Sequence, residues 1–261
     1  MIKQKIKNNF PYLFTFLKKT KKKIMHLRTY IPGYTTIHNY RNIKRRFFPS
    51  RKRLGFCGEN VILEYPLHFE VPSSVYLERS TRIREFCHII NTPNEKVTVK
   101  KYTVIAANCT IITNNHRSTA TIPQILLGAS HINDTSTDIT IGEDVWVGAN
   151  ATIMAGANIG RGSLIAAGAL VNKPVPPYSV VAGIPAKIIA RKFDLEDIIT
   201  HEKALYPEEE RMTRLELEEL FEKHLKDKKT FGTTEGIDAQ AIETLKALRE
   251  DREIEGPYNN E

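Results

Sequence analysis

The chain has 261 residues, 41% of them hydrophobic, which is enough to fill one large domain or two ordinary ones and is typical of a globular protein. Its three cysteines, Cys57, Cys87 and Cys109, match neither a disulfide framework nor a close-paired metal site, so we expect free thiols in a reducing cytoplasm. The net charge of +8 excludes little by itself, because it conceals a gradient along the chain.

The N-terminal segment, residues 1–55, is strongly basic. Residues 1–58 contain 16 lysines or arginines and no acid, and one or two basic helices broken near Pro32 and Gly33 are expected. The apolar run at residues 10–17 is shorter than the roughly 20 residues of a membrane span and is followed by lysines, so neither a transmembrane helix nor a secretory signal is predicted. A cytoplasmic protein is therefore expected.

Two roles for the basic segment stay open. It would be drawn to an anionic surface such as the inner leaflet, which would make the protein peripheral to the membrane. Alternatively, it would dock on the acidic C-terminal tail of its own or a neighbouring subunit. Few aromatic residues are interleaved among its charges, so a nucleic-acid partner is not expected.

Aliphatic residues recur at every sixth position in the next predicted domain, residues 56–192. Three series follow this spacing: Val71, Leu77, Ile83 and Ile89; Val99, Ile105 and Ile111; and Ile141, Val147, Ile153, Ile159, Ile165 and Val171. The fourth residue after most of them is small or short-branched. A period of six fits neither an amphipathic helix nor an alternating strand. It predicts a mainly β fold, a parallel β-helix with three flat sides and about 18 residues a coil, in which the aliphatic side chains point inward.

The six-residue rhythm is lost between His116 and Asp138. Residues 117–138 are therefore predicted to leave the β-helix as a loop. Loops on rigid scaffolds are common places for chemistry, so His116 at the exit of the coil is a candidate functional residue.

The C-terminal segment, residues 193–261, is predicted to be a helical acidic extension. Leu195, Ile198 and Ile199 are helically spaced, and a capping box of Thr213 and Glu216 opens a helix from Arg214 to about Lys226. The apolar face of that helix is predicted to consist of Leu215, Leu217, Leu220, Phe221 and Leu225. A last helix is expected near residues 239–249, followed by a loose end at residues 250–261.

The segment "ITIGEDVWVGANATIMAGANIGRGSLIAAGALVNKPVPPYSVVAGIPAKIIARKF", residues 139–193, resembles the closing coils of hexapeptide-repeat acetyltransferases, the group of maltose and galactoside O-acetyltransferases and xenobiotic acetyltransferases. The resemblance extends over roughly residues 56–193. It implies a left-handed parallel β-helix with helical N- and C-terminal extensions. It also implies a homotrimer, because the acyl-donor site of that family is built between neighbouring prisms.

The family places a histidine at the edge of a coil just before a long loop, and "IITNNHRS" places His116 there. The resemblance implies direct transfer of an acetyl group from acetyl-coenzyme A to a hydroxyl of a sugar or polysaccharide precursor, with His116 as general base and no metal. A sugar hydroxyl is a weak acid, so a base that titrates near neutral pH must take its proton as the oxygen attacks the thioester.

Contacts to the coenzyme are also implied by the resemblance. Trp146 would line the acyl-donor tunnel, although an aromatic at a subunit interface is an alternative. Ala149, Ala166 and Ala167 would lie along the pantetheine arm, although coil packing also requires small residues there. Asn172 and Lys173 would lie near the adenine end, with Lys187 and Arg191 near the 3′-phosphate. The family usually has Thr or Ser before this lysine and Asp after it, where this chain has Asn172 and Pro174.

Acceptor contacts are assigned to Asn114, Asn115 and His88. The two asparagines could instead shape the turn, and His88 could be a solvated histidine on an outer face. His131, inside the loop, could approach the site, but ordinary loop polarity is the favoured interpretation.

Other functions remain as alternatives. The nearest is an N-acyltransferase acting on an amino-sugar or a xenobiotic amine. A non-catalytic β-helix binding protein is a further one. A zinc-dependent carbonic anhydrase of the same fold needs three converging histidines, two of them commonly five residues apart, and the fifth residue after His116 is Thr121.

Overall fold

The structure is a computed structural model that describes residues 40, 43–44, 47–233 and 238–252. The chain divides into two compact units, Met1–Arg46 and Phe47–Glu261. The basic helices predicted in residues 1–50 fall almost entirely outside the described residues, as does the end of the chain from residue 253. Within the described part, no helix combines the length and apolar character that a membrane crossing requires.

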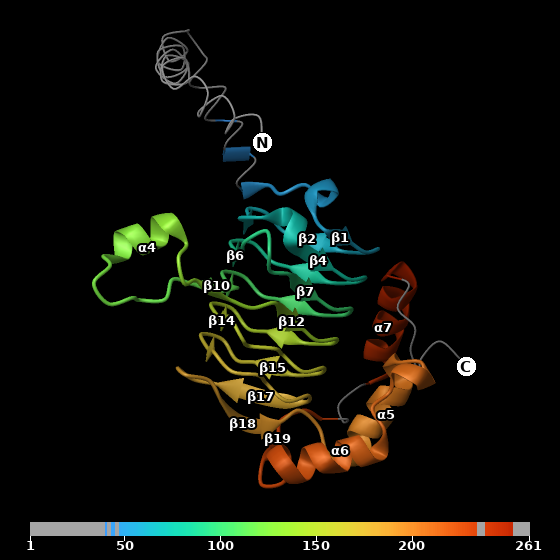
Figure 1. Cartoon of the computed structure of the whole chain (residues 1–261). Coiled ribbons are helices and arrows are strands. Elements are labelled where there is room, and N and C mark those ends of the chain that lie inside the picture. Colours follow the sequence, from blue (N-terminus) through green and yellow to red (C-terminus); the bar gives the residue numbers. More distant parts are fainter. Residues whose placement is uncertain (1–39, 41–42, 45–46, 234–237, 253–261) are drawn as a thin grey trace, which may run out of the picture. The chain divides into compact units, whose positions relative to one another are not determined.

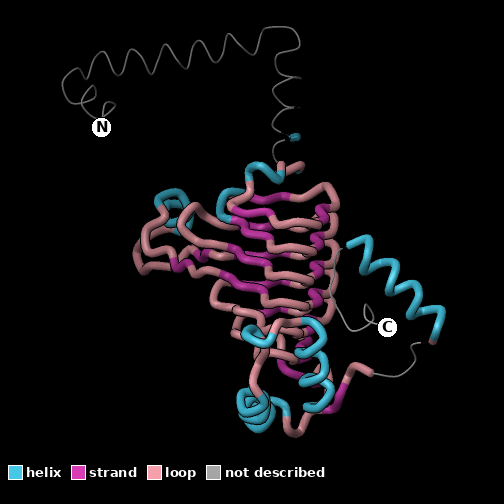
Figure 2. Tube along the Cα trace, turned by 90° about the vertical axis from the view of Figure 1, so that its right-hand side faces the viewer, coloured by secondary structure: helices cyan, strands magenta, loops and turns pink. Residues whose placement is uncertain are grey.

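The second unit is built on three parallel sheets that wind around one axis (Figures 1 and 2). The first face contains β1 (Phe56–Cys57), β4 (Val75–Leu77), β7 (Val97–Val99) and β12 (Ile139–Ile141). The second face contains β2 (Ile62–Leu63), β5 (Arg82–Ile83), β8 (Val104–Ile105), β13 (Trp146–Val147), β15 (Leu164–Ile165) and β17 (Ser179–Ala182). The third face contains β3 (His68–Phe69), β6 (His88–Ile90), β9 (Thr110–Ile112), β14 (Thr152–Met154) and β16 (Leu170–Val171).

The strand register explains the repeat and its interruptions. Trp146 pairs with Leu164, 18 residues later, which is one coil of three six-residue sides. Val75 pairs with Val97, so that coil is four residues longer, and Val97 pairs with Ile139 because the long loop is inserted in between. The six-residue spacing is correct from Leu77 onward.

One position of the predicted repeat is wrong. Val71 is half-buried and precedes the short helix η2 (Pro72–Ser74). The buried inward position of that coil is occupied by Phe69 of β3. The remaining predicted positions are all buried, and so are the small residues that follow them, such as Ala151, Ala157 and Ser163. Together they form one continuous core along the axis.

The corners of the β-helix turn tightly because single residues adopt the left-handed backbone conformation. Non-glycine residues at these corners with positive φ include Asn60, Ser80, Phe86, Tyr102, Asn108, Asp144, Asn150 and Tyr178. Asn and Asp tolerate this conformation better than most residues. The sharp corners allow each coil to lie directly on the one before.

Close stacking of the coils requires a glycine at position 160. A Cβ atom at this position would lie 2.3 Å from the backbone nitrogen of Pro177 in the next coil. Gly160→Ala should therefore lower the free energy of unfolding by about 1–3 kcal/mol, the usual cost of overpacking. Urea unfolding would measure it. Gly128→Ala is the matched control, because its added Cβ would meet nothing closer than 3.9 Å, and an unchanged Gly160→Ala variant would contradict the stacking argument.

The C-terminal extension is helical, as predicted. After β18 (Lys187–Arg191), which pairs antiparallel with β17, come α5 (Leu195–Leu205), η3 (Glu208–Glu210), α6 (Arg214–Leu220), a π-helical turn η4 (Phe221–Leu225), β19 (Lys229–Thr230) and α7 (Ala239–Arg252). The capping box of Thr213 and Glu216 is present. The predicted apolar face is wrong at Leu215, whose side chain is exposed, because α6 packs through Leu217 on Tyr178 and Ile198.

Ion pairs at one corner of the β-helix attach this extension. Asp144, in the corner between the first and second faces, accepts hydrogen bonds from Lys192 (2.7 Å) and from His201 of α5 (3.1 Å). Burial opposes ionisation of Asp144, but His201 and Lys192 outweigh it and lower the pKa of this carboxyl below its ordinary value of 3.8. The neighbouring Glu143 is likewise buried, and Lys100 and Arg161 lower its pKa below 4.5.

Acid should therefore loosen the attachment of the extension. A carboxyl with a lowered folded-state pKa contributes stability above its unfolded-state pKa, and this contribution is lost as pH falls through the folded-state value. We expect the Tm to fall as pH drops below the ordinary carboxyl values of 4.5 and 3.8. Asp144→Asn keeps a residue that tolerates the left-handed corner (φ 51°) and should flatten this part of the profile. An equally steep Tm profile in that variant would contradict the assignment.

Candidate active site

The long excursion leaves the β-helix after β9 and returns at β12. Its two ends pair as a short antiparallel ribbon, β10 (Asn114–Asn115) with β11 (Thr135–Ser136). Between them lies α4 (Gln124–Ser130), which projects from the side of the β-helix (Figure 1). The sequence predicted only a loop here, so α4 is a correction: Pro123 begins the helix, and His131 ends it in the left-handed conformation (φ 55°).

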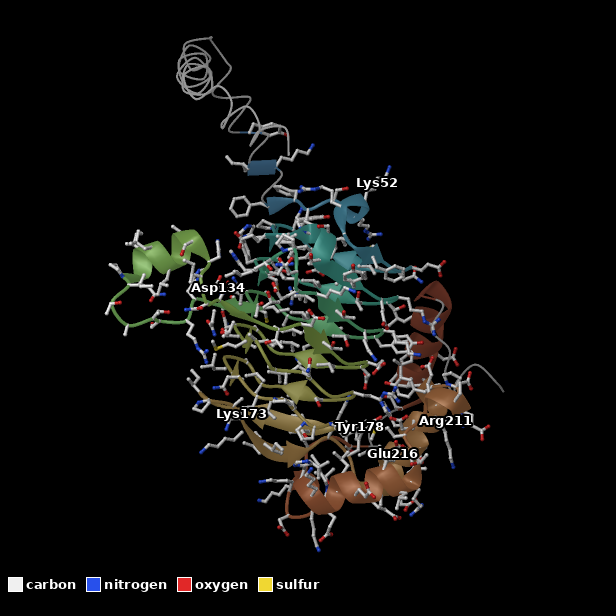
Figure 3. The ribbon with its side chains drawn as sticks, in the orientation of Figure 1. Lys52, Asp134, Lys173, Tyr178, Arg211 and Glu216 are labelled. Atoms are coloured by element: carbon white, nitrogen blue, oxygen red, sulfur yellow. The ribbon has the colours of Figure 1, made fainter. Side chains whose placement is uncertain are left out.

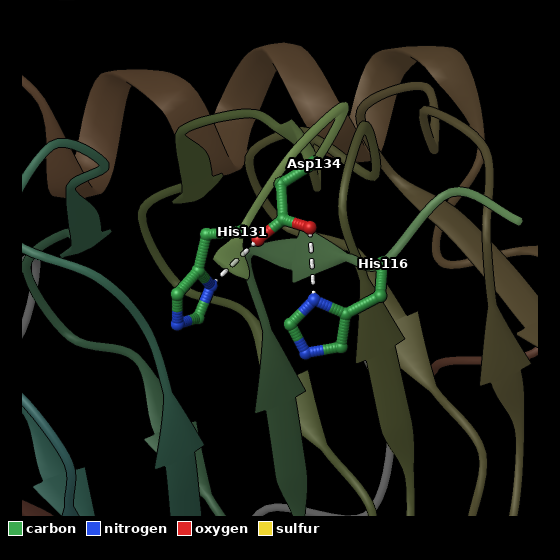
Figure 4. A group of neighbouring side chains, drawn as sticks. All are labelled: His116, His131 and Asp134. Atoms are coloured by element: carbon green, nitrogen blue, oxygen red, sulfur yellow. Dashed lines mark hydrogen bonds and ion pairs between the residues drawn. The ribbon is translucent and has the colours of Figure 1, made fainter. Parts of the chain in front are cut away.

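His116 follows the ribbon directly and meets two side chains from the other end of the excursion (Figure 4). Its Nδ1 atom lies 2.8 Å from Oδ1 of Asp134, and Nδ1 of His131 lies 2.9 Å from Oδ2 of the same carboxylate. The two imidazole rings have centroids 5.4 Å apart. One carboxylate thus holds two imidazoles, and we name this group the His116–Asp134–His131 cluster.

Helix α4 supports the position of His116. The Gln124 side chain donates a hydrogen bond to the His116 carbonyl (3.4 Å) and accepts one from Ser118 (3.2 Å). The ring of His116 passes close to Gly128 on the same helix. The left-handed end of α4 brings His131 to Asp134, three residues later. The local fold of the excursion therefore creates the cluster.

The electrostatics of the cluster define the state of each group. Hydrogen bonds from His116 and then His131 lower the pKa of the Asp134 carboxyl below its ordinary value of 3.8, so it is ionised at neutral pH. An ionised carboxylate only accepts hydrogen bonds, so Nδ1 of His116 donates to Asp134, and in the neutral tautomer that fits this contact Nε2 has the lone pair. His116 is 38% exposed and can therefore accept a proton from a bound molecule.

The same three groups have the spacing of metal ligands, since their ligand atoms lie within 4.8 Å of one another. This cluster contains two imidazoles, not the three that the carbonic anhydrase alternative requires. A carboxylate that holds the Nδ1 side of an imidazole is also the usual way to orient a histidine base. The hydrogen-bonded arrangement alone accounts for every contact of Asp134 described above.

The cluster opens onto a cavity of about 630 Å³ at the corner between the third and first faces. Besides His116, Asp134 and His131, it is lined by Asn114 and by residues of the preceding coil, among them Asn91 and Glu95. Of the three predicted acceptor contacts, only Asn114 lines this cavity. Asn115 is exposed on the ribbon, and His88 lies on the third face, edge-on to His68 at 5.5 Å.

The predicted coenzyme contacts fall into three places. Trp146 is 51% exposed on the second face, and Ala149, Ala166 and Ala167 lie at the corner that follows it. Asn172 and Lys173 are exposed after β16, at the same corner as His116 but two coils further along. Figure 3 shows Lys173 below Asp134. Lys187 is exposed on β18. In one chain, Trp146 therefore lies on the face opposite the corner that carries His116.

Arg191 differs from the other predicted coenzyme contacts because it already has partners. Its guanidinium donates to Asp194 (2.5 and 2.9 Å) and Thr230 (3.0 Å), and it lies over the ring of Phe221. These contacts join β18 to β19 and η4. Its predicted role at a phosphate stays a prediction.

Sequence reasoning missed two residues of the candidate site, Asp134 and Glu95. It interpreted His131 as an ordinary polar loop residue. Glu95 is 92% buried and accepts hydrogen bonds from Ser136 of β11 (2.6 Å) and from Thr92, so it attaches the excursion to the preceding coil. An acidic residue and a second histidine inside the aperiodic segment were the only available signals. The antiparallel pairing that brings them to His116 has no signature in the spacing.

Residues 138–173 match the family described as bacterial transferase hexapeptide (six repeats). The predicted hexapeptide repeat is thus confirmed, and with its three parallel faces the second unit is the predicted left-handed parallel β-helix. No curated protein matches the sequence.

Similar solved structures include a hexapeptide-repeat acetyltransferase from Vibrio cholerae, 26% identical over 55% of this chain and 77% of that chain, with a TM-score of 0.49. A galactoside acetyltransferase in complex with coenzyme A is 28% identical over 62% of this chain and 74% of that chain, with a TM-score of 0.49. A maltose O-acetyltransferase from Clostridium difficile is 25% identical over 54% of this chain and 71% of that chain, with a TM-score of 0.48.

Proposed function

We propose that this protein is an acetyltransferase that moves an acetyl group from acetyl-coenzyme A to a hydroxyl of a sugar or polysaccharide precursor. The observation that carries the proposal is the orientation of His116: Asp134 holds its Nδ1 side at 2.8 Å, which leaves Nε2 available beside an open cavity. A base placed in this way suits the activation of a weakly acidic hydroxyl.

In the proposed reaction, Nε2 of His116 takes the proton of the acceptor hydroxyl while the hydroxyl oxygen forms a bond to the thioester carbonyl carbon. Asp134 stabilises the imidazolium that results. Backbone N–H groups at the coil edge are the natural donors to the oxyanion. The carbon–sulfur bond then breaks, and His116 returns the proton to the departing thiolate. The acetyl group passes directly between substrates, without a covalent enzyme intermediate.

Acetyl-coenzyme A fits the residues that surround the β-helix. Trp146 offers an exposed aromatic surface, and Ala166 and Ala167 form a corner without bulky side chains. Lys173 and Lys187 are exposed and form no ion pair among the residues that the structure describes, so both are available to phosphates. Because Trp146 lies opposite His116 in one chain, the proposed donor site joins the second face of one prism to the loop corner of a neighbour in a homotrimer.

The experiment measures release of the coenzyme A thiol from acetyl-coenzyme A against a panel of neutral sugars, amino-sugars and xenobiotic amines, with mass spectrometry of the acceptor. The proposal expects sugar-dependent thiol release and an O-acetylated product. A product acetylated only on nitrogen would favour the N-acyltransferase alternative, and thiol release that never depends on an added acceptor would overturn the proposal.

A further inference from the structure

The cavity beside the His116–Asp134–His131 cluster has a strongly one-sided charge. Three carboxylates line it, those of Glu70, Glu95 and Asp134, and among the described residues that line it there is no lysine or arginine. Asp134 accepts hydrogen bonds from the two imidazoles. Glu70, at the end of β3, is exposed and forms no ion pair among the described residues.

The Glu95 side chain is held in a fixed position in the lining of this cavity. Its two oxygens accept hydrogen bonds from the hydroxyls of Ser136 and Thr92, and neither neighbour is a cation. With only 8% of its surface exposed, the side chain has little freedom to turn away from a bound molecule. A buried carboxylate with neutral partners exerts a stronger field than a solvated one.

Two basic side chains of the adjoining first-face strand and its approach, Lys96 and Lys100, are directed elsewhere. Lys96 places its ammonium group over the ring of Tyr76, 5.4 Å from the centroid, while only its backbone nitrogen faces Asp138. Lys100 is paired with Glu143. Neither lysine therefore pairs with Glu70 or Glu95, and no lysine or arginine is among the described residues that line the cavity.

We infer that Glu70 and Glu95 determine acceptor specificity: the acceptor carries no carboxylate or phosphate near the acetylated hydroxyl, and an amino group on it strengthens binding. The inference rests on the proposed function, whose acceptor it places in this cavity. An anionic acceptor would meet two uncompensated carboxylates in a partly desolvated site, which is specificity by repulsion. A protonated amine on the acceptor would supply the positive charge that the cavity lacks.

The test uses three methyl glycosides of one hexose that differ in charge: the neutral sugar, its 2-amino form and its 6-carboxylate. Binding to the full chain is followed by NMR of the histidine ring protons, which requires no acetyl transfer, and kcat/KM by thiol release. We expect the carboxylate to bind about tenfold or more weakly than the neutral sugar, and the amino sugar to bind most tightly. Glu70→Gln and Glu95→Gln should each reduce this discrimination.

Glu219→Gln, an exposed site on α6, is the matched control for the loss of one negative charge. Glu70→Gln keeps the test valid even if the buried Glu95→Gln variant does not fold. Equal binding of the carboxylate and the neutral sugar, unchanged discrimination in Glu70→Gln, or no binding of any of the three overturns the inference. If the three glycosides bind in the expected order of affinity but none is acetylated, only the proposed function is refuted.

Discussion

His116→Ala should lower kcat for acetyl transfer by about 10²–10⁴-fold, the contribution of a positioned general base. In the proposed reaction Nε2 of His116 takes the proton of the acceptor hydroxyl, and without it that hydroxyl must lose its proton to water. Because His116 is partly exposed at the exit of the excursion, the substitution should leave the Tm nearly unchanged. Steady-state thiol release and thermal unfolding would measure both quantities.

Two further variants separate the base from its orientation. Asp134→Asn offers only one acceptor oxygen for two imidazoles, so it should give activity between the wild type and His116→Ala. His224→Ala in the distant η4 is the matched control for removal of a partly exposed imidazole, and it should retain wild-type activity. If His116→Ala transfers acetyl at the wild-type rate, another group is the base and the role of the cluster is wrong.

The β-helix was predictable from sequence because every coil repeats the same constraint. Each six-residue side needs an aliphatic residue at its inward position. The six aliphatic residues from Ile141 to Val171 therefore repeat the same signal, and their spacing predicts the pairing of Trp146 with Leu164. Phe69 was missed because the turn after it is longer than the repeat, which moved the apparent register to Val71. One irregular corner was enough to displace the series locally.

Of the candidate site, only His116 and Asn114, which lie where the repeat ends, were predicted from the sequence. Asp134, the partner of His116, is 18 residues away, and Glu95 reaches Ser136 across 41 residues. Both contacts depend on the β10–β11 ribbon and on the end of α4, which are set by tertiary pairing and a single left-handed residue. Neither the ribbon nor the end of α4 produces a periodic signal, so these contacts could not be predicted from the hydrophobic spacing.

Arg161→Met should destabilise the attachment of the C-terminal helices by about 3–5 kcal/mol, the usual cost of leaving one member of a buried ion pair alone. Arg161 donates to Glu202 of α5 (2.9 Å), to Glu143 (3.2 Å) and to the Glu210 carbonyl (2.8 Å), and it lies 4.1 Å from the centroid of the Tyr206 ring. Glu202 is 2% exposed, so its charge cannot be solvated once the guanidinium is gone.

A second substitution should restore part of this loss. Glu202 also accepts hydrogen bonds from the Tyr178 hydroxyl (2.5 Å) and the Met212 backbone (3.1 Å), which the amide oxygen of glutamine can keep. Arg161→Met with Glu202→Gln should therefore be more stable than Arg161→Met alone, the non-additivity expected when two residues share one buried ion pair. Lys226→Met breaks the exposed pair with Glu222 and should change nothing measurable. Urea unfolding with hydrogen exchange in α5 would decide, and strictly additive effects would show that Arg161 acts by packing alone.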